Sequence, residues 1–161
     1  MLWAACCIAF CSFLRVSEFT ISGPDDYDKS SHLSLTDISV DSQTNPSLLK
    51  VTIKQSKTDP FHMGVNIYLG ATDRPICPVL GILPYLAAWG NQAGPLFITE
   101  DGKGLTHQFF SALLNFLLFQ LHLDTKSFIT HSICIGAATS GAHADIPKSY
   151  IKMLGSWQSD T

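Results

Sequence analysis

The residues best suited to chemistry in this chain lie towards its C-terminal end. His131 and Cys134 are three apart in the stretch HSICIGAATSGAH, and on a helix that spacing places both side chains on one face. A neighbouring histidine can lower the pKa of a thiol, so the pair could serve a thiol enzyme. However, small residues surround Cys134, and no aspartate or asparagine follows in an obvious place to orient the histidine. A buried, inert thiol is the competing interpretation.

Two cationic side chains elsewhere in the chain, Arg15 and Lys57, lie in short sequence motifs that could carry chemistry. Arg15 and Glu18 lie in LRVSE after an apolar run, at the spacing expected on one exposed face of a largely buried helix. Lys57 lies in QSKTD, at a turn between two predicted strands, and Lys54 precedes it in the same segment. Taken alone, the first pair is typical of a surface ion pair and Lys57 of a solvated turn residue.

Four segments taken in order resemble the tyrosine recombinases of the phage-integrase type. LRVSE is similar to the family's first-arginine motif, QSKTD to its strand-turn lysine, HSICIGAAT to its histidine helix, and LGSW to its final His/Trp position. The form is that of eukaryotic mobile elements, whose pattern is roughly HSFRIGAAT, a spacer, IK-LGRW-S and then a tyrosine. The resemblance runs from Phe13 to Asp160 and implies an α+β catalytic domain, mainly helical, with a small three-stranded antiparallel sheet.

This resemblance implies a site for a phosphodiester of double-stranded DNA. Arg15 would grip two phosphate oxygens with its planar fork, supported by Glu18. Lys57 would protonate the leaving 5′ oxygen, His131 would move the nucleophile's proton or donate to an oxygen, and Trp157 would donate its indole N–H. The family cuts and rejoins DNA through a phosphotyrosine, as tetramers on two duplexes, and without a metal or cofactor.

The chain departs from the family pattern at two positions. Cys134 stands where the family has its second arginine, and the sequence stops at Thr161, before the nucleophilic tyrosine. Losing an arginine that meets phosphoryl charge costs about 10³ to 10⁵ in rate, or roughly 4 to 7 kcal/mol. We therefore expect a chain that is inactive as written and at most binds DNA. The alternative is a non-catalytic protein-interaction domain that keeps the recombinase fold.

The elements that must position these residues follow from the hydrophobic pattern. We expect a buried N-terminal helix, then three strands over 34–40, 48–55 and 64–70 in a meander, because these runs alternate and turn formers separate them. Helices are predicted over 77–90, kinked or broken at Pro84, and over 107–122, where apolar residues on more than one face indicate core. Two further helices are predicted, one opening near His131 and one over 146–154. The small residues of the first would let another element approach closely.

Length and composition are consistent with one domain but do not identify a DNA-binding protein. The 161 residues are 46% hydrophobic and 14% charged, as expected of a compact globule. The resemblance implies that residues 1–161 form a single catalytic domain, without the family's N-terminal DNA-clamping domain or its tyrosine segment. The net charge of −3 and the lack of any Lys/Arg run give no independent support for DNA.

The cysteines and the apolar start of the chain exclude other classes. Five cysteines, an odd number without a CxxC pair, favour buried free thiols and an intracellular protein over a disulfide framework or zinc site. The opening run has no basic residues before it and is too short for the about 20 residues that span a bilayer. Neither a signal peptide nor a membrane partner is expected.

Overall fold

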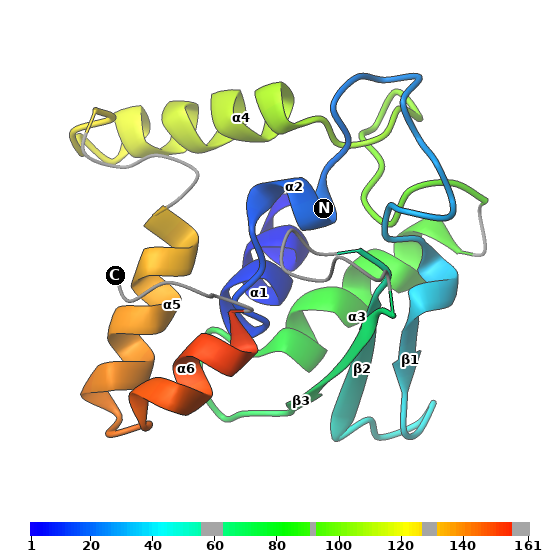
Figure 1. Ribbon diagram of the computed structural model, residues 1–161. Coiled ribbons are helices and arrows are strands. Elements are labelled where there is room, and N and C mark those ends of the chain that lie inside the picture. The colour runs from blue at the N-terminus through cyan, green and yellow to red at the C-terminus, as the bar shows by residue number, and fades with distance from the viewer. Residues whose placement is uncertain (56–62, 91–92, 127–131, 156–161) are drawn as a thin grey trace.

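The computed structural model describes residues 1–55, 63–90, 93–126 and 132–155. Within them, the chain forms helices and one three-stranded antiparallel sheet of order β1-β2-β3, which lies at one side of the domain (Figure 1). In chain order the elements are α1 (Leu2–Cys11), α2 (Val16–Phe19), the 3₁₀ turn η1 (Leu35–Asp37), β1 (Ile38–Val40), β2 (Leu48–Ile53), β3 (Val65–Gly70), α3 (Pro78–Trp89), α4 (His107–Gln120), α5 (Ser132–His143) and α6 (Lys148–Leu154). The predicted α+β architecture and strand meander are confirmed.

Helix α1 lies at the centre of the domain, between the sheet side and the α5–α6 side (Figure 1). It packs against α3 and α5, and α3 in turn packs against β2 and β3. Because α1 is apolar all round, it can be covered from both sides, as a helix in a core must be. β2 supplies the facing layer through Leu49, Val51 and Ile53, which alternate along the strand and are buried.

Glycines allow two close approaches between helices of the domain. A Cβ on Gly81 of α3 would lie 2.8 Å from Cys7 of α1, so only glycine fits that crossing. In α5, a Cβ on Gly141 would lie 3.3 Å from Ile151 of α6 and 3.7 Å from Phe13. The predicted role of the small residues in α5 is therefore confirmed at Gly141, whereas a Cβ on Gly136 would make only an ordinary contact of 3.7 Å with Phe10.

The end of α1 differs from the sequence prediction. The N–H of Leu14 bonds to the carbonyl of Ala9 at 2.9 Å, and Phe13 adopts a left-handed φ of 57°, so the helix stops before Arg15. Such a φ is uncommon for a bulky residue, and here it turns the Phe13 ring into a small cluster with Ala137 and Ile151. The expectation that Arg15 and Glu18 extend an exposed helix face was wrong, because this reversal starts a new element.

The boundaries of other elements also shift for local reasons. The first predicted strand begins four residues late, because the Asp37 carboxylate accepts bonds from the backbone N–H and hydroxyl of Ser34 at 2.8 and 2.7 Å and closes η1. Helix α3 runs through Pro84 without the predicted break. Pro84 is exposed, so the carbonyl that loses its N–H partner can bond water.

Helix α4 begins as predicted but is not the core helix that was expected. The Thr106 hydroxyl accepts a bond from the N–H of Phe109 at 3.1 Å and caps the helix. Only Phe110 of α4 is buried, where its ring meets Phe19 edge-on at 5.1 Å. The prediction failed because the apolar residues of a helix show which of its faces could be buried. They do not show which of those faces another element covers. No helix within the described ranges has the length and apolarity required to cross a membrane.

Candidate functional site

Arg15 and Glu18 form one unit at the start of α2. The Glu18 carboxylate accepts a bond from the Arg15 backbone N–H at 2.8 Å and pairs with the Arg15 guanidinium at 3.4 Å. Both side chains are mostly buried, 18% and 9% exposed. The acidic residue therefore fixes both the backbone and the guanidinium of Arg15, which is the geometry that LRVSE requires if Arg15 is to be held ready for a ligand.

Cys134 lies directly against this unit. Its thiol donates a bond of 2.8 Å to the carbonyl of Leu14, the residue before Arg15. Burial, and secondly the Glu18 carboxylate, raise the pKa of the Cys134 thiol, while Arg15 acts in the opposite direction. The position that carries the second arginine in the resembling family is thus within electrostatic reach of the first, although 119 positions separate Arg15 from Cys134.

This setting argues against the thiol-enzyme interpretation of His131 and Cys134. The thiol is 4% exposed, its raised pKa keeps it protonated at neutral pH, and its proton is used in the bond to Leu14. A protonated, buried thiol is a poor nucleophile. Across the described residues, no group of three His, Cys, Asp or Glu side chains is arranged to hold a metal ion.

Lys54 has a structural role at the end of β2. Its ammonium contacts Asp37 at 2.6 Å and donates to the carbonyls of Lys29 and His32 at 2.8 and 3.0 Å. These contacts tie the end of the strand to the segment before η1. Lys54 is therefore occupied, and Lys57 stays the candidate lysine of this hairpin; Lys57 itself lies outside the described residues.

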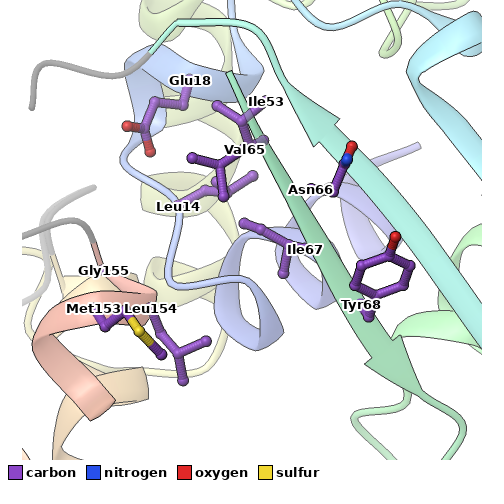
Figure 2. Close-up of a pocket in the computed structure, with 10 residues that line it drawn as sticks. All are labelled: Leu14, Glu18, Ile53, Val65, Asn66, Ile67, Tyr68, Met153, Leu154 and Gly155. Atoms are coloured by element: carbon purple, nitrogen blue, oxygen red, sulfur yellow. The ribbon is translucent and has the colours of Figure 1, made fainter. Parts of the chain in front are cut away.

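A cavity of about 410 Å³ lies between three of the predicted site segments. Figure 2 shows β3 with Val65 and Ile67 on one side, and the end of α6 with Met153 and Leu154 on the other. Further lining residues are Leu14, Glu18, Ile53, Asn66, Tyr68 and Gly155. The cavity is thus bounded by the Arg15 unit, by the hairpin, and by the last residue before the segment that contains Trp157.

Two more predicted residues, His131 and Trp157, also lie outside the described residues. The described chain resumes at Ser132, where α5 begins, and Cys134 in its first turn touches Leu14. Gly155, two positions before Trp157, lines the cavity with Leu14. Of the predicted set, the structure therefore brings together Arg15, Glu18 and Cys134, along with the residues that flank the other three.

Comparison with known proteins identifies this arrangement of elements. The structure of the XerH site-specific recombinase bound to its difH substrate superposes with a TM-score of 0.66 at 12% sequence identity. The fold is that of the tyrosine-recombinase catalytic domain. The Tn1549 transposon integrase bound to circular-intermediate DNA gives a TM-score of 0.56 at 12% identity, and a mutant Flpe recombinase bound to a DNA Holliday junction gives 0.56 at 11%.

Each of these superpositions covers 97% of the present chain. They cover 39%, 50% and 38% of the three recombinase chains, respectively, so the present chain spans at most half of their length. No family model matches the sequence, and no curated protein matches it. The structure thus shows the recombinase fold at sequence identities for which neither family models nor curated sequences give a match.

Sequence reasoning missed two parts of this site. The Leu14 carbonyl accepts the hydrogen bond of the Cys134 thiol. Because this carbonyl belongs to the backbone, no side-chain type at that position indicates its role. Phe13, whose left-handed φ redirects the chain before Arg15, occupies a position where glycine would have been the usual signal of a helix end. In both cases only a contact with a distant segment explains the local geometry.

Proposed function

We propose that this chain is a DNA-binding domain of tyrosine-recombinase type that no longer cleaves DNA. The observation that carries the proposal is the contact of Cys134 with the Leu14 carbonyl at 2.8 Å, which joins the start of α5 to the Arg15–Glu18 unit. The cavity beside it adds the hairpin of Lys57 and the end of α6. Segments far apart in the sequence thereby meet where a phosphate could be gripped.

The proposed ligand is a phosphodiester of duplex DNA, with Arg15 as its principal contact. A guanidinium presents a planar fork that matches two phosphate oxygens. Glu18 holds the backbone N–H and one guanidinium nitrogen of Arg15, so little side-chain freedom remains to be lost on binding. In this proposal Lys57, His131 and Trp157 would supply the further donors.

The loss of cleavage follows from the residue at the second-arginine position. Displacement at phosphorus spreads charge over the non-bridging oxygens, and fixed cationic donors stabilise it. Cys134 offers a single proton, and that proton is directed at Leu14. Without the second guanidinium, a rate loss of about 10³ to 10⁵ is expected.

A mobile element is the proposed origin of the domain. The HSICIGAAT and LGSW segments resemble the recombinases of eukaryotic mobile elements, and the fold likeness includes a transposon integrase. The activity of the ancestral enzyme would have been integration or recombination of DNA. Assembly as a tetramer on two duplexes belongs to the same proposal.

The DNA-binding proposal is tested by fluorescence anisotropy of a labelled duplex titrated with the chain at several salt concentrations. Binding should weaken as salt rises, because each neutralised phosphate contributes about −0.9 to the slope of log affinity against log salt. Arg15→Ala should weaken binding and reduce that slope by about 1. The matched control is Arg74→Ala, which removes an exposed arginine outside the site and should change neither quantity beyond a small general charge effect.

Two results would contradict the proposal. Absence of DNA retention even at low salt would favour the protein-interaction alternative, as would equal effects of Arg15→Ala and Arg74→Ala. The loss of cleavage is tested separately with a nicked suicide duplex, on which no covalent protein–DNA adduct should form. An adduct would show that cleavage survives.

A further inference from the structure

Ser22 is an exposed serine at the point where the chain leaves the core and enters an acidic loop. The residue before it is anchored, because the Ile21 carbonyl accepts a bond from the N–H of His107 at 3.1 Å, which holds the segment after α2 beside the start of α4 (Figure 1). Ser22 itself is exposed, and so are Asp25 and Asp26 after it. A modifying enzyme can therefore reach this loop without unfolding the core.

We propose that Ser22 is a phosphorylation site for a serine/threonine kinase that selects acidic substrates. In the transfer, the Ser22 hydroxyl oxygen attacks the γ-phosphorus of ATP, the bond from that phosphorus to the β,γ-bridging oxygen breaks, and ADP leaves. The hydroxyl proton passes to the catalytic aspartate of the kinase. The product is a phosphoserine that carries about −1.5 to −2 charges at pH 7.

The acidic residue three positions after Ser22 gives a kinase a charge to recognise. Kinases distinguish their substrates partly by the charge pattern around the hydroxyl, and Asp25 stands at this position, followed by Asp26. Among the serines and threonines that the structure describes, Ser34 alone shares the spacing, with Asp37. Ser34 is 4% exposed, and its hydroxyl donates to the Asp37 carboxylate at 2.7 Å. The structure thus selects Ser22 from the two.

The turn after Ser22 can open to enter the substrate groove of a kinase. It is closed by a backbone bond from the N–H of Asp26 to the carbonyl of Gly23 at 3.1 Å. Asp26 is exposed and Gly23 is half-buried, so water can replace this bond when the segment extends.

A cavity of about 480 Å³ beside Ser22 can hold the added phosphate. It lies between α2 and the start of α4, and its lining includes Ser22, His32 and His107. No carboxylate stands among the described residues that line it. On the loop side, the Asp26 carboxylate is so near Gly23 that a Cβ there would lie 2.9 Å from its Oδ2. Repulsion by this charge turns the phosphate away from the loop and towards the histidines.

His32 is held in a form that can donate to a phosphate oxygen. The backbone N–H of Asp28 donates to Nδ1 of His32 at 2.9 Å, which assigns the proton of the neutral ring to Nε2. The Tyr27 ring lies against the His32 ring at a centroid distance of 6.2 Å, and the His32 carbonyl accepts a bond from the Lys54 ammonium at 3.0 Å. A ring fixed in this way loses little freedom when its Nε2–H binds an anion.

Phosphorylation of Ser22 should weaken DNA binding, a consequence that rests on the proposed function. Ser17 lines the same cavity and lies two positions after Arg15. The negative charge of the phosphoserine therefore repels a backbone phosphate held by Arg15, although salt screens part of this repulsion. We expect the affinity for duplex DNA to fall about three- to fivefold at about 0.1 M salt.

Treatment of the 161-residue chain with Mg²⁺–ATP and casein kinase II, an acid-directed serine/threonine kinase, tests the proposal. Mass spectrometry should show one added phosphate, which tandem fragmentation places on Ser22. Ser22→Ala should abolish its addition, and Asp25→Asn should slow it about tenfold by removing the charge that the kinase recognises. The matched control is Ser30→Ala, which removes an exposed serine of the same loop without an acidic residue three positions later and should leave the rate unchanged.

A chain that gains no phosphate, or gains it at another residue, would overturn the proposal, as would an unchanged rate in Asp25→Asn. The cavity is tested by ³¹P NMR titration of the phosphorylated chain. Its second phosphate pKa should lie below the ordinary value of about 6, because the histidine donors favour the dianion. His32→Ala should return this pKa towards the ordinary value, whereas the control His143→Ala, at an exposed position of α5, should not. An unshifted pKa would overturn the assignment of the phosphate to the cavity.

The DNA consequence is measured by anisotropy of the same duplex with phosphorylated and unmodified chain, and kinase-treated Ser22→Ala is the control. Equal affinities of the phosphorylated and unmodified chains would overturn the regulatory consequence. If the unmodified chain binds no DNA, the proposed function fails, while phosphate found on Ser22 still supports the modification site. The two failures are therefore distinguishable.

Discussion

Replacing Lys54 with methionine provides a stringent test of how the site is supported. The ammonium of Lys54 lies 2.6 Å from the Asp37 carboxylate, and the two side chains are only 20% and 9% exposed. Lys54→Met keeps most of the side-chain volume and removes the charge. The Asp37 carboxylate is then left largely buried without its cation.

The magnitude follows from what Asp37 keeps. Breaking a buried pair by removing one partner costs about 3 to 5 kcal/mol, but two bonds from Ser34 to Asp37, at 2.8 and 2.7 Å, survive. We therefore expect a loss near the lower limit, about 3 kcal/mol. For a domain of this length that lowers the melting temperature by about 6 to 12 °C and removes a large share of a typical stability of about 5 to 15 kcal/mol.

Urea unfolding followed by far-UV circular dichroism measures this loss. The midpoint should fall without a change in slope, because the surface exposed on unfolding stays the same. Lys103→Met is the matched control: its pair with Asp101, at 3.2 Å, is 66% and 60% exposed, and water already screens it. The control should unfold at the same urea concentration as the unmodified chain.

A loss below about 1 kcal/mol for Lys54→Met, the level of an exposed ion pair, would refute the reasoning that the Lys54–Asp37 contact supports the end of β2. A double-mutant cycle with Asp37→Asn then gives the coupling directly. If the loss is as large as expected, reduced DNA binding of any Lys54 variant has to be interpreted as a folding defect. Lys57 would remain the residue to test for a direct role.

Three further predictions concern packing and protonation. Gly81→Ala should lower the free energy of unfolding by about 1 to 3 kcal/mol, because it overpacks the α1–α3 crossing. Gly136→Ala, whose new methyl group would lie 3.7 Å from its nearest neighbour, should raise it by up to about 1 kcal/mol. The urea midpoints of the two variants measure this difference. Cys134→Ala should cost about 1 to 3 kcal/mol by leaving the Leu14 carbonyl without its donor, and Cys134→Ser should recover part of the loss in the same assay. Burial raises the pKa of Cys6 from 9.0 to about 11. The contribution of this thiol to stability is therefore complete below pH 9 and is lost as the pH rises from 9 to about 11. When the free energy of unfolding is measured at a series of alkaline pH values, it should decline less steeply with pH in Cys6→Ala than in the unmodified chain.

Much of the fold could be predicted because its signals are local. Alternating residues predicted β2, whose Leu49, Val51 and Ile53 are buried. The helix predicted from residue 107 begins there as α4, and Thr106 caps it through the N–H of Phe109. Such signals depend on periodicity and on bonds between near neighbours, which the order of residues contains directly.

The candidate site was predicted less completely, since its residues are related across long sequence separations. The sequence indicated Arg15, Glu18 and Cys134 through motifs, but it placed the first two on an exposed helix face. It chose Lys57 over Lys54 through the resemblance of QSKTD alone, and only the structure shows that Lys54 is held by Asp37. Those distinctions depend on which segments lie beside the end of β2 and beside α2.

The sequence by itself determined most of the helices and the three strands, their order and the four motifs that resemble a recombinase, but neither α2 nor η1. Only the tertiary structure decided that α1 stops at Cys11 and that Cys134 meets Leu14. It also decided that Phe110 is the buried residue of α4 among the parts of the chain that the structure describes. The physical reason is that helix and strand formation depends mainly on neighbouring residues, whereas burial and pairing depend on contacts between residues far apart in the chain.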